Sequence, residues 1–521
     1  MLPDVTWGLP GARLSPPLPG VAGFSATPLL HLLRQAAARN PQAIALASLG
    51  ESLSHGALLA QAMQVAAAIA RLVPPGAPVA CLMPQRPQGM AGLLGCLLAG
   101  RLCLVLNPAE PAERLAALLA DAAPVALLLA APLAVPCAAP ALMLGEILAG
   151  PATEWQLDHA WNPEAPLAVH FTSGSSGRPK GIVLSARSLL ARPFEAMHYW
   201  RLGPADVVLA TSLPSTSAGL AFLLAALLAG GRALVTHIGA EGAAAVLKLA
   251  GREAVTCAAG GPALWRLMLG LAAAPRAFRA LRLLRVGNAA VVPAELAAWR
   301  GLLPPGCQVQ HTYASTEALV MAQWLVPPGK QPGAATLAAG QAEATHEMAL
   351  LDAAGQPVPA GEAGELVLRG PLLALGEWQG GRLVPGRLPA EPGRPGWRRF
   401  HTGDLVRVAP DGLLRVVGRA DRQVKINGVR VEPAEIEAVL RAEPGVVDAA
   451  VLAGTVAGRT VLQGFVAAPG LAEATLLPAL RQRLAAGLPS AFRPARLVVL
   501  ERLPRLAGNG KLDQAALLGL P

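Results

Sequence analysis

Aromatic and charged residues are scarce in this chain of 521 residues. Phe, Trp and Tyr together make up 4% of the sequence and charged residues 15%, whereas hydrophobic residues make up 53%. So much apolar side chain and so little charge argue against an intrinsically disordered protein. With so few aromatics, a sizeable core has to be filled by Leu, Ala and Val.

Two long stretches, residues 122–145 and 207–231, contain no charged residue. A membrane-spanning helix needs about 20 predominantly apolar residues. Both stretches are interrupted by proline, and the second contains several Ser and Thr. We therefore interpret them as buried helices and strands of a large α/β core, and we expect no membrane span.

The six cysteines, Cys81, Cys96, Cys103, Cys137, Cys257 and Cys307, form no CxxC pair and lie among apolar residues. This pattern predicts small buried hydrophobic side chains in a reducing compartment. The first residues also lack the basic start and apolar run of a signal peptide. We expect a cytoplasmic protein.

Positive charge is in excess, with 43 Lys and Arg against 33 Asp and Glu. The basic residues are scattered rather than grouped, and no stripe alternates basic and aromatic residues as a base-stacking surface would. We therefore expect no nucleic-acid binding. An anionic cofactor or an acidic protein partner fits the charge better.

Short apolar runs alternate with Ala- and Leu-rich helical stretches through the first 400 residues. This alternation predicts βαβ units and an α/β fold with mainly parallel sheets flanked by helices. Residues 376–399, rich in Gly, Pro and Arg, predict a surface loop. A hairpin is predicted around residues 410–412 and a helix from Glu432. We place a domain boundary at 420/421, which gives a large domain of residues 1–420 with a small β subdomain, and a small, mobile α+β domain of residues 421–521.

The segment FTSGSSGRPKG, residues 171–181, lies between two apolar runs. Gly, Ser and Thr can direct several backbone N–H groups and hydroxyls at one anion, and Lys180 can add a positive charge. The segment does not match the P-loop pattern GxxxxGK[ST], because Gly181 follows the lysine. It resembles the phosphate loop of the adenylate-forming superfamily, which contains acyl-CoA synthetases, luciferase and nonribosomal peptide synthetase adenylation domains.

Three further segments resemble motifs of that superfamily in the same order and cover nearly the whole chain. They are HTYASTE at 311–317, TGD at 402–404 followed by GRAD at 418–421, and GNGKLD at 508–513. The resemblance is closest to nonribosomal adenylation domains. It implies ATP and Mg²⁺ as cofactors, an acyl-AMP intermediate and transfer of the acyl group to a thiol.

The resemblance also implies a role for individual residues. Lys511 is the candidate catalytic lysine, Glu317 and Thr172 are candidate Mg²⁺ ligands with a part in catalysis, and Asp421 is the candidate hinge. The remaining residues of the implied nucleotide site are Ser173, Gly174, Ser175, Ser176, Gly177, Lys180, Gly287, Asn288, Tyr313, Thr316, Asp404 and Arg419. Within that set, Tyr313 is expected to stack on adenine and Asp404 to bind the ribose hydroxyls.

The carboxylic acid is poorly specified by the sequence. Ser217 stands where amino-acid-activating members of the superfamily have an aspartate, which argues against an α-amino acid. For Arg285 we favour an exposed strand end over a side chain that points into the pocket. The expected pocket residues are Ser217, Ala218, Ala221, Arg285, Gln310 and Thr312.

The acceptor thiol is expected on a separate carrier protein, because the motifs around Asp404 and Lys511 look closer to carrier-loading adenylation domains. CoA is the alternative acceptor. A relative that binds nucleotide without catalysis is a third possibility, against which the presence of both Glu317 and Lys511 argues. The sequence leaves the acid, the pathway and the oligomeric state open.

Overall fold

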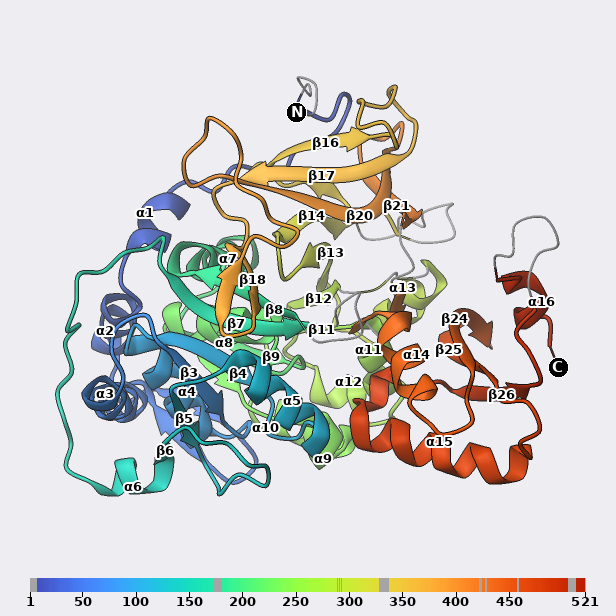
Figure 1. The fold of residues 1–521 in the computed structure, drawn as a ribbon. Helices are drawn as coiled ribbons and strands as arrows, with labels where there is room; N and C mark the ends of the chain where they lie inside the picture. Colours follow the sequence, from blue (N-terminus) through green and yellow to red (C-terminus); the bar gives the residue numbers. More distant parts are fainter. Residues whose placement is uncertain are drawn as a thin grey trace.

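The computed structural model of the protein describes residues 7–172, 180–287, 289, 291, 293–327, 337–420, 424–426, 429–456, 459–504 and 512–520. A large α/β domain precedes a smaller α+β domain, which lies at one side of it (Figure 1). The predicted fold class is confirmed. Residues 421–423 lie outside the described part of the chain, so the boundary at 420/421 stays a prediction.

Two large sheets form the centre of the first domain. The first has the order β15-β14-β13-β12-β11-β9-β10-β1-β2 and is parallel from β13 to β1. Its strands, in chain order, are β1 (Ile44–Ala47), β2 (Ser52–Ser54), β9 (Val207–Ala210), β10 (Arg232–Leu234), β11 (Cys257–Gly260), β12 (Leu283–Gly287), β13 (Gln308–Ser315), β14 (Leu319–Val326) and β15 (Gln341–Ala342).

The second sheet has the order β19-β18-β8-β7-β4-β3-β5-β6. Its strands are β3 (Pro78–Leu82), β4 (Leu102–Leu106), β5 (Ala126–Leu129), β6 (Ala141–Met143), β7 (Pro166–Thr172), β8 (Lys180–Ser185), β18 (Gly376–Gln379) and β19 (Arg382–Val384). The last two strands correct the prediction of a surface loop at 376–399. Gly376, at a φ of 150°, starts a strand that pairs with β8, and so the segment extends the sheet.

Helices pack in three layers around the two sheets. The layer between the sheets shares one apolar core with both and contains α2 (Leu29–Arg39), α3 (His55–Leu72), α4 (Pro87–Leu98), α7 (Ala186–Trp200) and α8 (Ser217–Leu228). The outer face of the first sheet is covered by α10 (Ala243–Arg252), α11 (Pro262–Leu269), α12 (Ala274–Ala277) and α13 (Pro293–Arg300). The outer face of the second sheet is covered by α5 (Ala112–Ala122). Three short helices complete the domain: α1 (Val21–Ala26), α6 (Leu144–Ala149) and α9 (Ile238–Glu241).

A four-stranded antiparallel sheet, β16-β17-β20-β21, forms the expected β subdomain. Its strands are β16 (Glu347–Leu351), β17 (Gly364–Gly370), β20 (Arg398–Val408) and β21 (Leu414–Arg419). The predicted hairpin is the β20–β21 pair. Gly412 in its turn has a φ of 77°, a left-handed value that glycine adopts without strain.

The small domain contains a two-stranded ribbon, a three-stranded sheet and two longer helices. Its elements are β22 (Val424–Ile426), β23 (Val429–Val431), α14 (Pro433–Arg441), β24 (Asp448–Val456), β25 (Arg459–Ala467), α15 (Glu473–Gly487), the 3-10 turn η1 (Ser490–Phe492), β26 (Arg496–Leu500) and α16 (Gln514–Leu518). α14 is the helix that the Glu-Pro-Ala-Glu segment predicts.

The uncharged stretches became core elements, as expected. Residues 207–231 form β9 and the fully buried α8, and residues 122–145 contain β5 and β6. In the described part of the chain, no helix has the length and apolar character needed to cross a membrane. All six cysteines are free thiols; Cys137 and Cys307 are half-buried and the other four are buried.

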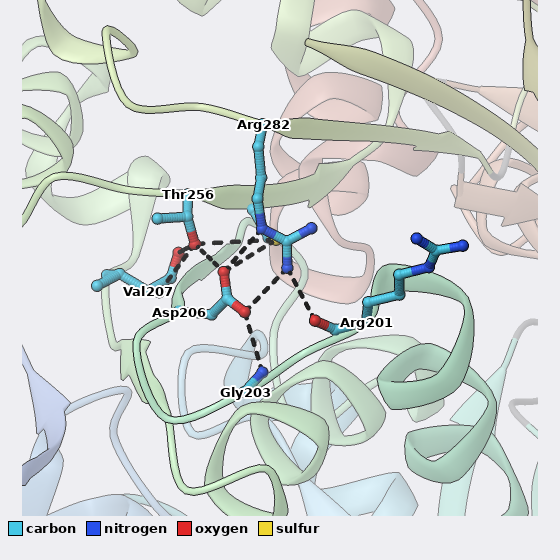
Figure 2. A network of polar contacts seen from close by, with 7 residues as sticks. Arg201, Gly203, Asp206, Val207, Thr256 and Arg282 are labelled. Carbon is cyan, nitrogen blue, oxygen red and sulfur yellow. Dashed lines mark hydrogen bonds and ion pairs between the residues drawn. The ribbon is translucent and has the colours of Figure 1, made fainter. Parts of the chain in front are cut away.

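A polar network around Asp206 ties three strands of the first sheet together (Figure 2). Arg282, directly before β12, donates to both carboxylate oxygens of Asp206 at 2.9 Å, and Thr256 donates to Oδ1 at 2.7 Å. Burial opposes ionisation of this carboxyl, but the hydrogen bonds from Arg282 and Thr256 outweigh burial and lower its pKa. Asp206 thus fixes the start of β9 relative to β11 and β12, the strand that carries Arg285 and Gly287.

Candidate active site

One corner of the site joins the first large sheet to the β subdomain. The hydroxyl of Tyr313 on β13 donates to Oδ2 of Asp404 on β20, and Nη1 of Arg419 on β21 donates to Oδ1. Asp404 and Arg419 are direct partners in the β20–β21 register, which explains why motifs 14 residues apart in the sequence meet. Tyr313 and Asp404 are each only 6% exposed.

The backbone holds this carboxylate in place. The N–H of Asp404 donates to Oγ1 of Thr402 at 3.0 Å, and that hydroxyl donates to the carbonyl of Leu366 at 2.8 Å. Burial and the neighbouring Asp404 carboxylate raise the pKa of Tyr313 well above its ordinary value. The tyrosine therefore stays a neutral donor across the physiological pH range.

The small domain reaches the same corner. The ammonium group of Lys425 on β22 lies 5.4 Å from the centre of the Tyr313 ring, within the range of a cation–π contact. A second contact between the domains is the ion pair of Arg114 on α5 with Glu435 on α14, where Arg114 also lies 5.2 Å from the ring centre of Phe492.

The strands that flank the predicted phosphate loop form a hairpin. Thr172 ends β7 and Lys180 begins β8, and the two residues are register partners. The Lys180 ammonium lies 3.5 Å from Oε2 of Glu377 on β18. The loop residues Ser173, Gly174, Ser175, Ser176 and Gly177 lie outside the described residues, as do Asn288, Asp421 and Lys511.

A second corner gathers polar groups at the start of α8. Thr216 caps this helix by accepting a hydrogen bond from the N–H of Gly219 at 3.1 Å, and Ser217 is its first residue. Nη1 of Arg192 on α7 donates to Oγ of Ser217 at 2.7 Å, and Ser217 lies 3.4 Å from the hydroxyl of Thr316. Glu317 is buried, at 6% exposure, directly after Thr316. Burial lowers the pKa of Arg192, and the charges of Glu195 and Glu317 oppose that shift.

Arg285 lies inside the protein, which corrects the expectation of an exposed strand end. Its side chain is 2% exposed, and its guanidinium carbon lies 4.7 Å from the ring centre of Phe222 on α8. Alternation along β12 explains the correction: Leu284 and Val286 enter the core on the outer face, so Arg285 and Gly287 face the helices between the sheets.

The other expected pocket residues divide into two groups. Thr312 is buried and pairs with Gly287 in the β12–β13 register. The Gln310 side chain makes two hydrogen bonds: it accepts from the Trp200 indole at 2.7 Å and donates to the Gln323 side chain at 2.5 Å. Ala218 and Ala221 are buried on α8. The Gln310 side chain therefore stabilises the packing around β13. The Thr312 hydroxyl, on the same strand, has no hydrogen-bond partner among the described residues.

The sequence analysis missed Arg192, Glu195, Phe222 and His170. A signal for the first two was present, because they are charged residues three apart in an otherwise largely apolar helix. Nδ1 of His170, next to the phosphate loop, donates to the carbonyl oxygen of Ser215 at 2.9 Å. Burial lowers its pKa to about 4, so the imidazole is neutral at pH 7.

Comparisons with known proteins give the family. The "AMP-binding enzyme" family matches residues 33–378, and the "AMP-binding enzyme C-terminal domain" family matches residues 435–511. A plipastatin synthase protein of Bacillus subtilis is 33% identical over 501 residues, which are 94% of this chain and 19% of that protein. The chain thus spans about a fifth of that relative's length.

Two solved structures share the fold. An NRPS protein containing adenylation and PCP domains, bound to a vinylsulfonamide inhibitor, is 25% identical, with a TM-score of 0.79 over 96% of this chain and 85% of that one. The o-succinylbenzoate CoA synthetase of Bacillus subtilis is 22% identical, with a TM-score of 0.78 over 93% of this chain and 98% of that one, and shows the fold alone. The chain belongs to the AMP-binding enzyme family.

Proposed function

We propose that this enzyme activates a carboxylic acid with ATP and transfers the acyl group to the phosphopantetheine thiol of a carrier protein. The observation that carries the nucleotide part is the convergence of Tyr313, Asp404 and Arg419 from three strands. Together they offer an aromatic face, a fixed carboxylate that can accept from two hydroxyls, and a guanidinium. An adenosine with its ribose hydroxyls and phosphate matches this combination.

Mg²⁺ fits the residues available. This ion is usually bound through one or two carboxylates together with phosphate oxygens, rather than by a cage of protein ligands. Glu317, the residue that follows Thr316, offers one buried carboxylate, and Thr172 offers a second oxygen at the end of β7. Glu317 and Thr172 would hold the ion, which when bound supplies charge neutralisation on the phosphates.

The chain's own groups then have separate tasks in the first half-reaction. The acid's carboxylate oxygen attacks the α-phosphorus and pyrophosphate leaves. Thr316, Lys180 and the phosphate loop would bind phosphate oxygens, and Lys511 would neutralise the charge that builds up in the transition state. Asp404 and Tyr313 orient the nucleoside, which fixes the α-phosphorus relative to the acid.

In the second half-reaction a thiolate attacks the acyl carbon and AMP leaves. A carrier protein is the proposed donor of this thiol, in line with the similarity to a protein with adenylation and PCP domains. Carrier proteins are often acidic, and the net charge of +10 would speed their encounter with this enzyme. The Asp421 hinge would let the small domain exchange Lys511 for the thiol.

The test is pyrophosphate release, with hydroxylamine as the trap for the activated acyl group, across fatty, aryl, hydroxy, dicarboxylic and amino acids. We expect release that depends on one class of acid and falls by about 100-fold or more in Lys511→Ala. Carrier protein and CoA are then offered separately as acceptors. Transfer to CoA alone would contradict the carrier assignment, and ATP binding without release for any acid would contradict activation.

A further inference from the structure

The corner around Arg285 contains buried polar atoms that the protein itself does not satisfy. Nη1 of Arg285 and Oγ1 of Thr312 are both inaccessible to solvent and have no hydrogen-bond partner among the described residues. A buried donor left without a partner destabilises the protein, and more so when the group is charged. Two such atoms from neighbouring strands call for a ligand that supplies acceptors.

The two side chains border the same point. A Cβ at Gly287 would lie 2.5 Å from Oγ1 of Thr312 and 3.2 Å from Nη2 of Arg285, so both groups converge over this glycine. Glycine at position 287 permits this close approach of the two side chains, which a Cβ would obstruct. The ring of Phe222 lies against the guanidinium on the other side and shields it from water.

Buried groups of both signs lie around Arg285: Arg192 is a second cation, and Glu195 and Glu317 act on Arg192. The positive charge of Arg192 lowers the pKa of Arg285. The negative charge of Glu195, on the same helix as Arg192, raises it. Burial lowers the pKa of Arg285 to about 9, with a further contribution from Arg192, so it is still charged at pH 7. Burial and the charge of Glu343 raise the pKa of Glu195 well above its ordinary value, although Arg192 and Arg285 lower it. The raised pKa makes Glu195 a weaker counter-ion for the arginines.

We propose that the acid activated by this enzyme carries a second carboxylate, which is bound by the guanidinium of Arg285 and the hydroxyl of Thr312. This inference rests on the proposed function, since it concerns the acid of that same reaction. A carboxylate can accept from Nη1 of Arg285 and from the Thr312 hydroxyl at once, and its charge pairs with the buried guanidinium. The substrate class is therefore a dicarboxylic acid, of which only one carboxylate is adenylated.

The experiment compares matched pairs of acids of equal length: pentanoate with glutarate, hexanoate with adipate, and benzoate with isophthalate. Pyrophosphate release gives kcat/KM for each, and calorimetry without ATP gives binding. For at least one pair we expect the dicarboxylic acid to be preferred by about 100-fold or more, because the matched monocarboxylate leaves buried polar groups unpaired. Arg285→Met should abolish this preference, whereas Arg279→Met, at an exposed position before the same strand, should keep it.

The outcomes separate this inference from the proposed function. Release from other acids with no preference for any dicarboxylic acid overturns the second carboxylate and leaves adenylation standing. Binding of a dicarboxylic acid that Arg285→Met weakens, without release, supports the second carboxylate and overturns activation. A wild-type preference that persists in Arg285→Met overturns the role of Arg285, and circular dichroism of both variants shows whether they are folded.

Discussion

At the scale of single residues, the corner formed by Tyr313, Asp404 and Arg419 depends on one carboxylate with several partners. Tyr313, Arg419 and the Thr402 hydroxyl all contact Asp404 or its backbone. The sequence identified Asp404 and Arg419 through their motifs and resemblance. It could not show that the Tyr313 hydroxyl reaches Asp404, because that contact joins strands 91 residues apart in different sheets.

Asp404→Asn should weaken ATP binding by about 10- to 100-fold, since a neutral amide accepts less strongly from the ribose hydroxyls and removes the negative charge that faces Arg419. Calorimetric titration with ATP measures the change. The matched control is Asp411→Asn, a carboxylate in the β20–β21 turn that pairs with the Arg415 side chain. Equal ATP affinity in wild type and Asp404→Asn would contradict the placement of the nucleotide.

Arg285 shows where residue-level reasoning from sequence fails. An arginine near a strand end is usually exposed, and the sequence gives no direct sign of the partner strand or of the helix above it. The decisive facts are the pairing of β12 with β13 and the packing of Phe222 from α8. Both depend on residues far away in the chain.

At the scale of elements, the start of α8 is positioned by a close backbone approach. A Cβ on Gly219 would lie 2.1 Å from the carbonyl oxygen of Leu213. The sequence predicted a buried helix here from the uncharged run. The need for glycine at this position was not predictable, because it arises from the turn that leads into the helix.

Gly219→Ala should therefore lower the free energy of unfolding by about 2 kcal/mol or more, and it should shift Ser217 away from Arg192. Thermal or denaturant unfolding measures the loss. Gly145→Ala is the control, since a Cβ there meets nothing within 4 Å in helix α6, and alanine should stabilise by about 0.5–1 kcal/mol. Similar stability changes in the two variants would contradict this view of the α8 turn.

The strands β9, β11 and β12 are held together by Asp206 (Figure 2). Asp206→Asn should lower the free energy of unfolding by about 1–2 kcal/mol at pH 7, because Arg282 and Thr256 lose a charged acceptor. The lowered pKa of Asp206 means that its stabilising effect is present above pH 4 and is lost as the pH falls through that pKa. Denaturant unfolding at pH 7 and at pH 3 tests this: the difference between wild type and variant should shrink at pH 3, and a constant difference would argue against ionisation as the cause.

At the scale of the whole molecule, charged side chains take part in the contact between the described parts of the two domains. Glu435 of α14 is 2% exposed at its side chain, and Arg114 of α5 is its cation. Burial raises the pKa of Glu435, and Arg114 opposes that shift. Sequence motifs predicted two domains but not this pair, since nothing local connects residues 321 positions apart.

Arg114→Ala should loosen the docking of the small domain, because it leaves Glu435 buried without its cation, at a cost of about 3 kcal/mol in the docked arrangement. Small-angle scattering should report a larger radius of gyration, and limited proteolysis should cut faster between the domains. Arg114→Lys keeps the charge and should be close to wild type. An unchanged radius of gyration in Arg114→Ala would show that the pair does not govern docking.

In the proposed reaction a carboxylate oxygen of the substrate attacks the α-phosphorus of ATP. An acid carrying oxygen-18 in its carboxyl group, followed through one full turnover with a thiol acceptor, reports which phosphorus is attacked. We expect mass spectrometry to find AMP with one labelled oxygen, and unlabelled pyrophosphate. Label in pyrophosphate or in inorganic phosphate, with unlabelled AMP, would place the attack at another phosphorus and rule out the proposed adenylation.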